Sequence, residues 1–598
     1  MRAVSARIDF SDPDNPGGPR LRCAFGTPRQ TLVAHGLEQV RPVLDAVQAA
    51  AAQGFWCVGY LRYEAAPAFD AALAAHAAEG PLAWFAVYDE ALPWSEENPQ
   101  AEVRLQWKEM LCRPAFDVAL NDIQRAIAGG ELYQVNYTAS MSGFLSASSS
   151  GTLYDEAGAD AALALFSALR RAQPGGYSAY LDTGDEQVLS VSPELFFDWC
   201  AGRILTRPMK GTAPRGATPA EDAAQARALH TSAKERAENV MIVDLLRNDL
   251  SRIAEPFSVR VPRLFQTEAL PTVWQMTSDV EARTRVGTTL ADVFAALFPC
   301  GSVTGAPKVR AMQMIRALEP EARGVYCGAL GVVRPGEQGI RATFNVPIRT
   351  VTLQGDAVRC GIGSGITSGA RVDAEWREWR HKRAFVERAS RPFDLLETLA
   401  LEDGVLRDAP AHLARMAAAA AHFGYPWQPQ PVDQCLQQLA QAHPQGMWRV
   451  RLLLDARGRA QAEAYPLPAS PKRVRLQLAD RAIDEALGEF VRFKTTRRAH
   501  YDAFTPTQPG VFDTLLWNTE GEITECIRGN VALLLDGRWV TPPLRCGLLD
   551  GIGRANALRA GRLTETVVRL DDLPRVQALA FVNSLRGWIA ADLNRDCM

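Results

Sequence analysis

A lysine and a glutamate are the first residues in this chain whose types suggest chemistry. Lys210 stands in the run Arg207-Pro208-Met209-Lys210-Gly211-Thr212, which is typical of a strand end turning into a glycine-containing loop. Glu194 ends an earlier apolar run. In one pocket, the two could act as nucleophile and general acid if burial or a nearby cation lowers the pKa of the amine. Taken alone, Lys210 is more typical of a solvated loop lysine.

Two pairs of glutamates form a second candidate group. Glu235 and Glu238 lie three residues apart on one helical stretch, and Glu375 and Glu378 do so on another. Each pair therefore places two carboxylates on one helix face. Four converging carboxylates would repel one another without a cation between them, and oxygen-only ligation suits Mg²⁺. Either pair alone also fits a solvated, charged helix face.

A glycine-rich segment follows at residues 361–365, with the sequence GIGSG. Small residues permit close approach to the backbone, so amide N–H groups in such a turn can face an anion. A glycine-rich turn alone is weak support for a binding site.

Length and composition limit the classes of function. At 598 residues the chain is too long for one hydrophobic core, and its 47% hydrophobic and 22% charged residues are those of an ordinary globular protein. A net charge of -3 disfavours nucleic-acid binding. The start lacks a signal-peptide pattern and no apolar stretch is long enough to span a bilayer, so we expect a cytoplasmic protein without membrane contact. Eleven scattered cysteines without a Cys-x-x-Cys pair favour neither a zinc site nor a disulfide framework.

The elements that must position these residues indicate an α/β (α+β) chain. Residues 1–110 mix short strands with an alanine-rich helix around 43–52. Residues 111–388 alternate helical patterns, beginning with a helix at 115–128, and strand patterns, which predicts large sheets flanked by helices. Residues 389–392 read as a linker, and a second domain is expected over 393–598.

Several motifs of the first domain occur in an order that resembles the chorismate-utilising enzymes. They are SPE (192–194), PMKGT (208–212), ERAE (235–238), VDLLRNDL (243–250), GSVTGAPK (301–308) and GIGSG (361–365). That family includes anthranilate synthase component I, isochorismate and salicylate synthases, and aminodeoxychorismate synthase component I. Other members usually carry Ala at the position of Lys210, whereas Lys is characteristic of aminodeoxychorismate synthase. The resemblance implies stacked sheets around a chorismate site.

The resemblance also implies roles for individual residues. Lys210 adds to C2 of chorismate while Glu194 protonates the departing C4 hydroxyl, and ammonia then adds at C4 and expels the lysine. Both glutamate pairs match magnesium-binding positions, with Glu238 and Glu378 expected as direct ligands. The substrate-binding positions are Thr304, Tyr326, Arg349, Gly363, Ser364 and Gly365.

Two further features of the first domain qualify that resemblance. Gln275 stands where many relatives carry His, which weakens the transfer of that role, although an amide can still hydrogen-bond the ring. No glutaminase pattern is visible, so we expect ammonia from a separate glutamine amidotransferase subunit or from solution.

The second domain resembles the fold-type IV pyridoxal-phosphate (PLP) enzymes, which include branched-chain and D-amino-acid aminotransferases and 4-amino-4-deoxychorismate lyases. Its motifs are HLARM (412–416), FKTTR (493–497), EITEC (522–526) followed by Asn530, and LDGIGR (549–554). The resemblance makes Lys494 the Schiff-base lysine and Glu525 the partner of the pyridine nitrogen. The phosphate would be bound by Arg415 with the amides of Gly551, Ile552 and Gly553. Thr398 matches a threonine near the cofactor in the lyases.

Two departures from the PLP family stand in this domain. Gly553 replaces a threonine of many relatives, which removes a hydroxyl contact to phosphate. The domain also begins at Phe393 without the leading strands of a free-standing relative. Either the first domain covers the exposed edge or lyase activity is compromised.

Fusion to an aminodeoxychorismate synthase favours the lyase, because its substrate is the product of the first domain. Such a chain would convert chorismate and ammonia into 4-aminobenzoate and pyruvate for folate synthesis, with Mg²⁺ and PLP as cofactors. One alternative is an anthranilate synthase joined to an aminotransferase, which Lys210 disfavours. The other is a catalytically silent second domain that stabilises the synthase or forms a homodimer.

Overall fold

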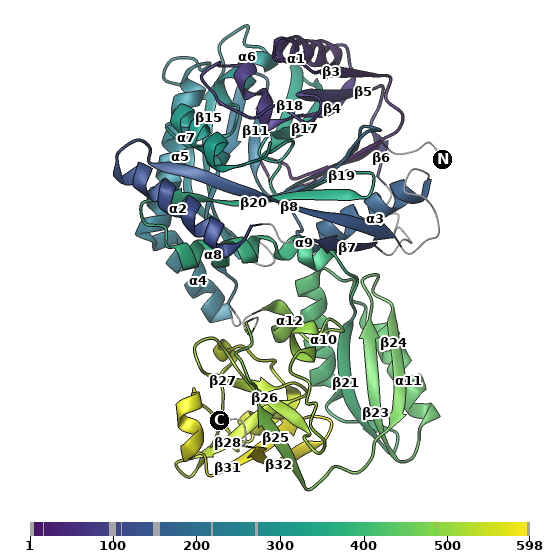
Figure 1. Cartoon of the computed structure of the whole chain (residues 1–598). Helices are drawn as coiled ribbons and strands as arrows, with labels where there is room; N and C mark the ends of the chain where they lie inside the picture. The colour runs from purple at the N-terminus through teal and green to yellow at the C-terminus, as the bar shows by residue number, and fades with distance from the viewer. Residues whose placement is uncertain are drawn as a thin grey trace. The chain divides into compact units, whose positions relative to one another are not determined.

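The computed structural model describes residues 5–15, 17–94, 103–108, 111–147, 156–216, 219–269, 273–484, 486 and 488–594. The chain forms two compact units, residues 1–391 and 392–598 (Figure 1). Among the described residues, no helix combines the length and apolar character needed to cross a membrane.

Unit 1 contains two ten-stranded sheets whose strands pair antiparallel. The first has the order β16 (Gly305–Ala306), β8 (Gln134–Ala147), β20 (Ala357–Thr367), β19 (Thr350–Gln354), β10 (Gln187–Ser192), β9 (Tyr177–Asp182), β1 (Ala6–Phe10), β2 (Leu21–Phe25) and β6 (Leu92–Pro93), and β7 (Val103–Trp107) pairs with β8. The second has the order β13 (Met209–Pro214), β15 (Val273–Arg283), β12 (Arg203–Arg207), β11 (Leu195–Cys200), β18 (Gly339–Asn345), β17 (Ala329–Gly336), β4 (Trp56–Leu61), β5 (Ala83–Tyr88) and β3 (Gln30–Ala34), and β14 (Arg260–Ala269) pairs with β15.

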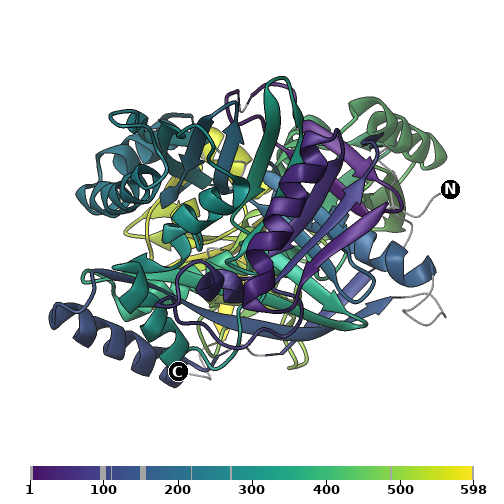
Figure 2. The same cartoon turned by 90° about the horizontal axis from the view of Figure 1, so that it is seen from above.

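The two sheets pack face to face with helices outside them. Apolar residues of both inner faces, such as Ile8, Val58 and Val332, are fully buried between the sheets. Helix α1 (Leu37–Ala52) covers the outer face of the second sheet with its apolar stripe (Figure 2). Helices α2 (Arg113–Ala128), α3 (Glu156–Ala172), α8 (Val372–Lys382) and α9 (Ala384–Ala389) pack against the first sheet. Unit 1 therefore has four layers.

The remaining α-helices of unit 1 pack on the two sheets and on one another. They are α4 (Pro219–Thr231), α5 (Ala233–Ser251), α6 (Leu290–Leu297) and α7 (Lys308–Leu318). Helix α5 begins where the Ser232 hydroxyl accepts the backbone N–H of Glu235. This cap places Glu235 and Glu238 in the first two turns of a helix that packs on β13 and β15.

Unit 2 contains a four-stranded and an eight-stranded sheet (Figure 1). The smaller sheet has the order β22 (Val405–Leu406), β21 (Leu395–Glu402), β23 (Met447–Leu454) and β24 (Ala460–Pro466), and it packs with α10 (Ala409–Phe423) and α11 (Pro429–Ala442). The larger sheet has the order β27 (Ile523–Cys526), β26 (Asp513–Trp517), β25 (Arg473–Leu478), β32 (Gly587–Asn594), β31 (Ala578–Asn583), β28 (Asn530–Leu535), β29 (Arg538–Thr541) and β30 (Thr564–Glu565). Three short helices complete the unit: α12 (Glu489–Arg492), α13 (Ala499–Asp502) and α14 (Ile552–Arg559).

Two local predictions from the sequence were wrong. The segment around Lys210 is not a loop, because the chain resumes as strand β13 directly after Pro208. The glycine-rich segment 361–365 is not a turn but the middle of β20, paired along its length with β8. In both cases pairing with a neighbouring strand prevails over the local preference of glycine. The helices expected at 115–128 and around both glutamate pairs are confirmed.

Candidate active sites

Lys210 and Glu194 line one cavity of unit 1, of about 250 Å³. Glu194 directly precedes β11 and Lys210 lies on β13, and both strands belong to the second sheet. The backbone is irregular at this point. The β13–β15 register shifts between Met209 and Thr212, and Gly211 has a φ of 87°. This bulge places the Lys210 amine 3.3 Å from the carbonyl oxygen of Ser302, to which it donates.

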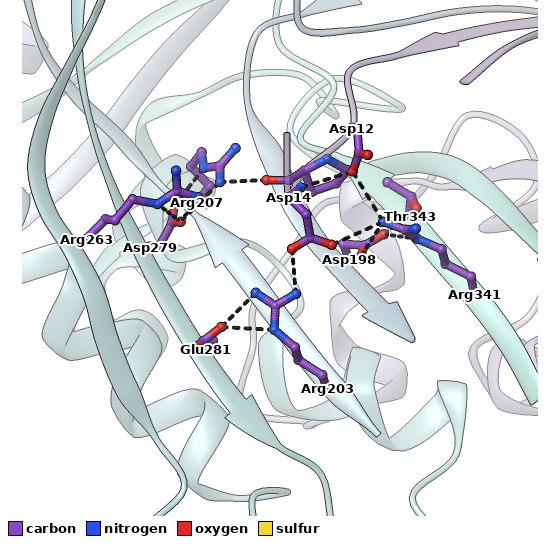
Figure 3. A network of polar contacts seen from close by, with 11 residues as sticks. Asp12, Asp14, Asp198, Arg203, Arg207, Arg263, Asp279, Glu281, Arg341 and Thr343 are labelled. Atoms are coloured by element: carbon purple, nitrogen blue, oxygen red, sulfur yellow. Dashed lines mark hydrogen bonds and ion pairs between the residues drawn. The ribbon is translucent and has the colours of Figure 1, made fainter. Parts of the chain in front are cut away.

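A buried ion-pair network holds the strand that leads to Lys210 (Figure 3). The Arg207 guanidinium, at the end of β12, donates to Asp279 on β15 at 2.6 Å and to the carbonyl of Pro13 at 2.8 Å. Asp279 also accepts from Arg263 on β14 at 2.7 Å. A forked guanidinium bond fixes orientation as well as position. The network therefore joins β12, β14, β15 and the loop after β1. Its central residue, Arg207, lies only three residues before Lys210.

The surroundings shift the two groups towards the protonation states that the sequence argument requires. Burial lowers the pKa of the Lys210 amine, Glu194 opposes this, and Lys382 adds to it. Burial raises the pKa of the Glu194 carboxyl, although Ser302 and Lys210 act in the opposite direction. The Glu194 Oε1 atom is buried and has no hydrogen-bond partner. An amine shifted towards its neutral form thus shares a cavity with a carboxyl shifted towards its protonated form.

All four predicted magnesium ligands line the same cavity, namely Glu235, Glu238, Glu375 and Glu378. Burial, followed by the charge of the other member of the pair, raises the pKa of Glu235 and of Glu375. The Glu375 carboxylate also accepts the Ser364 hydroxyl at 2.6 Å. The pKa of Glu378 is lowered instead, because burial would raise it but the charge of a nearby lysine outweighs that effect.

Two lysines that the sequence argument missed now balance these carboxylates. Lys382 pairs with Glu378 at 2.7 Å, and Lys234 lies 3.8 Å from both Glu235 and Glu238. No group of three or more His, Cys, Asp or Glu side chains in the described part of the chain is placed to hold a metal ion. The glutamates therefore fit Mg²⁺ in donor type and charge. In this structure, however, Glu235, Glu238 and Glu378 form ion pairs with lysines, and the four carboxylates do not converge on a metal position. A lysine four residues after Glu378 on the same helix was the available sequence signal.

Tyr326, Arg349 and residues of β20 also line the cavity. A Cβ at Gly361 would meet the Tyr326 ring at 2.2 Å, so only glycine lets the ring lie on this strand. Burial, with some repulsion from Arg388, lowers the pKa of Arg349 to about 10, and the guanidinium donates to the neutral amide of Gln173. Strand β20 pairs with β8 along its whole length, but its pairing with β19 ends at Cys360. Gly363 and Gly365, which follow Cys360, line the cavity.

Two predicted substrate-binding residues do not line this cavity. The Thr304 hydroxyl donates to the carbonyls of Cys300 and Gly301, at 3.1 and 3.3 Å, and so closes a turn. Ser364 lies between Trp379, whose indole N–H it accepts at 2.9 Å, and Glu375. Both hydroxyls position neighbouring groups. Gln275 does line the cavity, and its amide donates to the Gly211 carbonyl at 2.8 Å, which fixes the bulge beside Lys210.

In unit 2, Lys494 and Thr398 line a cavity of about 420 Å³. Burial lowers the pKa of the Lys494 amine to about 8, and Glu397 opposes this shift. A lysine with such a pKa is partly neutral near pH 8 and can act as a nucleophile. This is the property expected of a lysine that binds an aldehyde cofactor.

Glu525 is the buried carboxyl of this unit. It accepts the Tyr501 hydroxyl at 2.6 Å, the Leu549 backbone N–H at 3.2 Å and the Asn530 amide at 3.3 Å. Burial nevertheless raises its pKa to about 8, because the charge of Arg498, which acts in the opposite direction, is too small an effect, and further positive charge is needed to keep the carboxylate ionised. A protonated pyridine nitrogen would supply that charge. The surroundings of Glu525 therefore fit PLP.

The predicted phosphate-binding residues also come together. Arg415 donates to the Asp550 carbonyl at 2.8 Å, beside Gly551 and the N-terminus of α14, where free amides attract anions. A Cβ at Gly553 would lie 2.6 Å from the backbone of Asn583. The threonine of many relatives has no room here, which explains that departure.

Glu397 is a residue of this site that sequence reasoning missed. It is buried, and it accepts from Arg415 at 2.8 and 2.7 Å and contacts His412 at 2.6 Å. Burial would raise its pKa, but Arg415 and His412 hold it at about 2. Glu397 therefore orients the arginine. A carboxylate within the otherwise apolar strand pattern of residues 395–401 was the signal that could have found it.

Both units match known families. Residues 14–388 match the family of chorismate binding enzymes, and residues 394–592 match amino-transferase class IV. The chain therefore belongs to the chorismate binding enzymes. It is a fusion in which this enzyme domain precedes a fold-type IV domain of the class that implies pyridoxal phosphate.

Curated relatives match the first domain. Over 277 residues the chain is 41% identical to aminodeoxychorismate synthase component 1 of Klebsiella aerogenes, a match that covers 46% of this chain and 57% of that protein. It is 42% identical over 219 residues to anthranilate synthase component 1 of Streptomyces coelicolor, covering 36% and 42% of the two chains. The chain thus spans about half the length of these relatives. Among solved structures, the menaquinone-specific isochorismate synthase MenF of Escherichia coli is 17% identical with a TM-score of 0.51, covers 65% of this chain and 89% of its own, and shares the fold alone.

Proposed function

We propose that the chain is a bifunctional enzyme that makes 4-aminobenzoate and pyruvate from chorismate and ammonia. Unit 1 acts as an aminodeoxychorismate synthase, and unit 2 acts as a 4-amino-4-deoxychorismate lyase. The observation that carries the synthase assignment is the Lys210 amine facing the same cavity as the protonation-prone Glu194. A relative named aminodeoxychorismate synthase component 1 supports it.

In unit 1, the neutral Lys210 amine attacks C2 of chorismate, and both ring double bonds shift as the bond from C4 to its hydroxyl breaks. Glu194 gives its proton to that hydroxyl, which departs as water. Ammonia then adds at C4 and the Lys210 amine leaves C2, which regenerates the enzyme. Tyr326 and Arg349, which line the same cavity, bind a substrate carboxylate.

Glu235, Glu238, Glu375 and Glu378 hold Mg²⁺ in this proposal, with Glu238 and Glu378 as direct ligands. The ion supplies positive charge to a substrate carboxylate. Lys234 pairs with Glu238 and Lys382 pairs with Glu378 in the structure. Both lysines release these glutamates when the ion binds.

Ammonia reaches unit 1 from a separate glutamine amidotransferase subunit or from solution. The name component 1 of the relatives supports a second component. The isolated chain is therefore expected to use ammonium salts.

In unit 2, PLP supplies an electron sink for the bond changes at the substrate. Lys494 holds the cofactor and moves protons, Glu525 keeps a proton on the pyridine nitrogen, and Arg415, oriented by Glu397, binds the phosphate. The lyase assignment rests on pairing with unit 1, whose product is the lyase substrate. A catalytically silent unit 2 is the main alternative, and a purified protein without the PLP–lysine absorbance band near ~420 nm would favour it.

Two lysine variants test the proposal. Lys494→Ala should accumulate 4-amino-4-deoxychorismate, because unit 2 loses its cofactor lysine while unit 1 remains intact. Lys210→Ala should make no 4-amino product from chorismate but should still cleave 4-amino-4-deoxychorismate that is supplied. Mixing the two variants should restore 4-aminobenzoate formation. Release of 4-aminobenzoate by Lys494→Ala at the parent rate would refute the lyase assignment.

A further inference from the structure

The cavity beside Lys494 is strongly cationic. Four arginines line it, Arg449, Arg498, Arg528 and Arg586, together with the lysine itself. Its lining residues include no aspartate or glutamate. Arg528 pairs with Asp513 at 3.3 Å. Within the described ranges, the other three arginines have no carboxylate within salt-bridge distance, so their charge is available to a ligand.

Neutral groups hold these three arginines in place. Arg498 donates to the Ile527 carbonyl at 2.6 Å and lies over the Tyr501 ring. Arg586 donates to the Pro468 carbonyl at 3.3 Å, and Arg449 lies 4.9 Å from the centroid of the Tyr465 ring. Such contacts fix a guanidinium without cancelling its charge. They leave further N–H groups for a second partner.

This cavity is distinct from the expected phosphate site. Arg415 and residues 551–553 are absent from its lining, whereas Lys494 and Thr398 belong to it. Its lining also includes Asn583, whose backbone lies against Gly553, so the cavity adjoins the phosphate-binding residues. Phe512 and Phe581 add apolar surface between the arginines. A ligand that fits would be flat and apolar in the middle and anionic at its ends.

We propose that Arg449, Arg498 and Arg586 bind the two carboxylates of a dianionic substrate and so select the substrate of unit 2. The inference rests on the proposed lyase function and deepens it. 4-Amino-4-deoxychorismate carries one carboxylate on its ring and one on its enolpyruvyl group, which matches a cavity with several uncompensated guanidiniums. An apolar amino acid carries a single carboxylate and leaves at least one of these arginines without an anionic partner.

An inert dicarboxylate tests this selection in the full-length holoenzyme. Isophthalate has two carboxylates on one ring, and benzoate has one. Because the chorismate cavity of unit 1 also takes anions, binding is followed through the shift of the PLP absorbance band, which reports on unit 2 alone. Isophthalate should shift the band at about ten-fold lower concentration than benzoate, as one extra charged hydrogen bond implies. Its affinity should fall as salt is added.

Arginine variants identify the residues. Arg449→Gln and Arg586→Gln should each weaken isophthalate binding about ten-fold, and each should raise the KM of the lyase step for supplied 4-amino-4-deoxychorismate. Arg451→Gln is the matched control, because Arg451 lies on the same strand, pairs with Glu463 at 3.7 Å and does not line the cavity. It should behave as the parent does.

The outcomes separate the two proposals. Equal binding of isophthalate and benzoate, or equal effects of Arg449→Gln and Arg451→Gln, would overturn the dianion site even in an active lyase. Tight, arginine-dependent isophthalate binding in a protein that releases no pyruvate would support the dianion site and refute the lyase function. Folding of each variant is checked by the unchanged PLP band of the ligand-free protein.

Discussion

Replacing Glu194 by glutamine isolates the proton that the synthase step requires. The amide has the shape of the carboxyl but cannot donate an acidic proton. Because Oε1 of Glu194 has no hydrogen-bond partner, the substitution breaks no bond at that atom. General acids typically contribute about 10²–10⁴-fold to a rate, or about 3–5 kcal/mol of barrier. Glu194→Gln should therefore lower kcat for ammonium-dependent chorismate consumption by about 10²–10⁴-fold.

The pH profile of this variant gives a second readout. In the parent, activity should fall at high pH because the Glu194 proton is lost, and it should fall at low pH because the Lys210 amine is protonated. Glu194→Gln should lose only the decline at high pH. Glu281→Gln is the control, since Glu281 pairs with Arg203 outside the cavity. An unchanged kcat, or an unchanged decline at high pH, would refute the acid role.

The Glu194→Gln substitution should lower kcat without lowering the free energy of unfolding at neutral pH. Burial raises the pKa of Glu194 in the folded state, so the unfolded chain loses this proton first as pH rises. The free energy of unfolding of the parent therefore decreases between the unfolded and folded pKa values. Glu194→Gln lacks this loss, and its Tm should be equal to or higher than that of the parent at neutral pH. A large drop in Tm would attribute the lost activity to misfolding.

Three further predictions concern the ligands of the two sites. Glu378→Ala should abolish synthase turnover and leave the PLP band intact, because the Mg²⁺ site loses a carboxylate, and unchanged chorismate consumption would exclude the site. Glu397→Gln should weaken PLP binding by about ten-fold or more, measured by equilibrium dialysis, because Arg415 loses a charged partner; equal retention of PLP would contradict its orienting role. Glutamine should give no product with the chain alone and should replace ammonium only when an amidotransferase subunit is added, so glutamine-driven product from the pure chain would contradict the partner proposal.

The sequence was sufficient to predict several helices and many of the residues that share the cavity of unit 1. Spacing placed each glutamate pair on one helix face, and the helices carry them into the same cavity as Lys210. These are consequences of local periodicity. The ordered motifs similarly predicted the family of unit 2 and, with it, the candidate residues Lys494, Glu525 and Arg415.

What the sequence could not provide depends on contacts between distant segments. The sequence identified Glu378 and Arg415 as site residues. That Lys382 pairs with Glu378 and that Glu397 binds Arg415 is visible only in the packed structure. The orientation of the Thr304 hydroxyl towards Cys300 is a matter of turn geometry that residue type does not reveal. The arginines beside Lys494 come from separate strands and loops, so no linear pattern joins them.

The most direct test of the whole account is product analysis of the purified full-length chain. It should be supplied with chorismate, Mg²⁺, an ammonium salt and PLP, and the products should be separated and quantified over time. 4-Aminobenzoate and pyruvate should form in equimolar amounts. Formation of anthranilate, or accumulation of 4-amino-4-deoxychorismate without 4-aminobenzoate in the PLP-loaded protein, would contradict the proposed function.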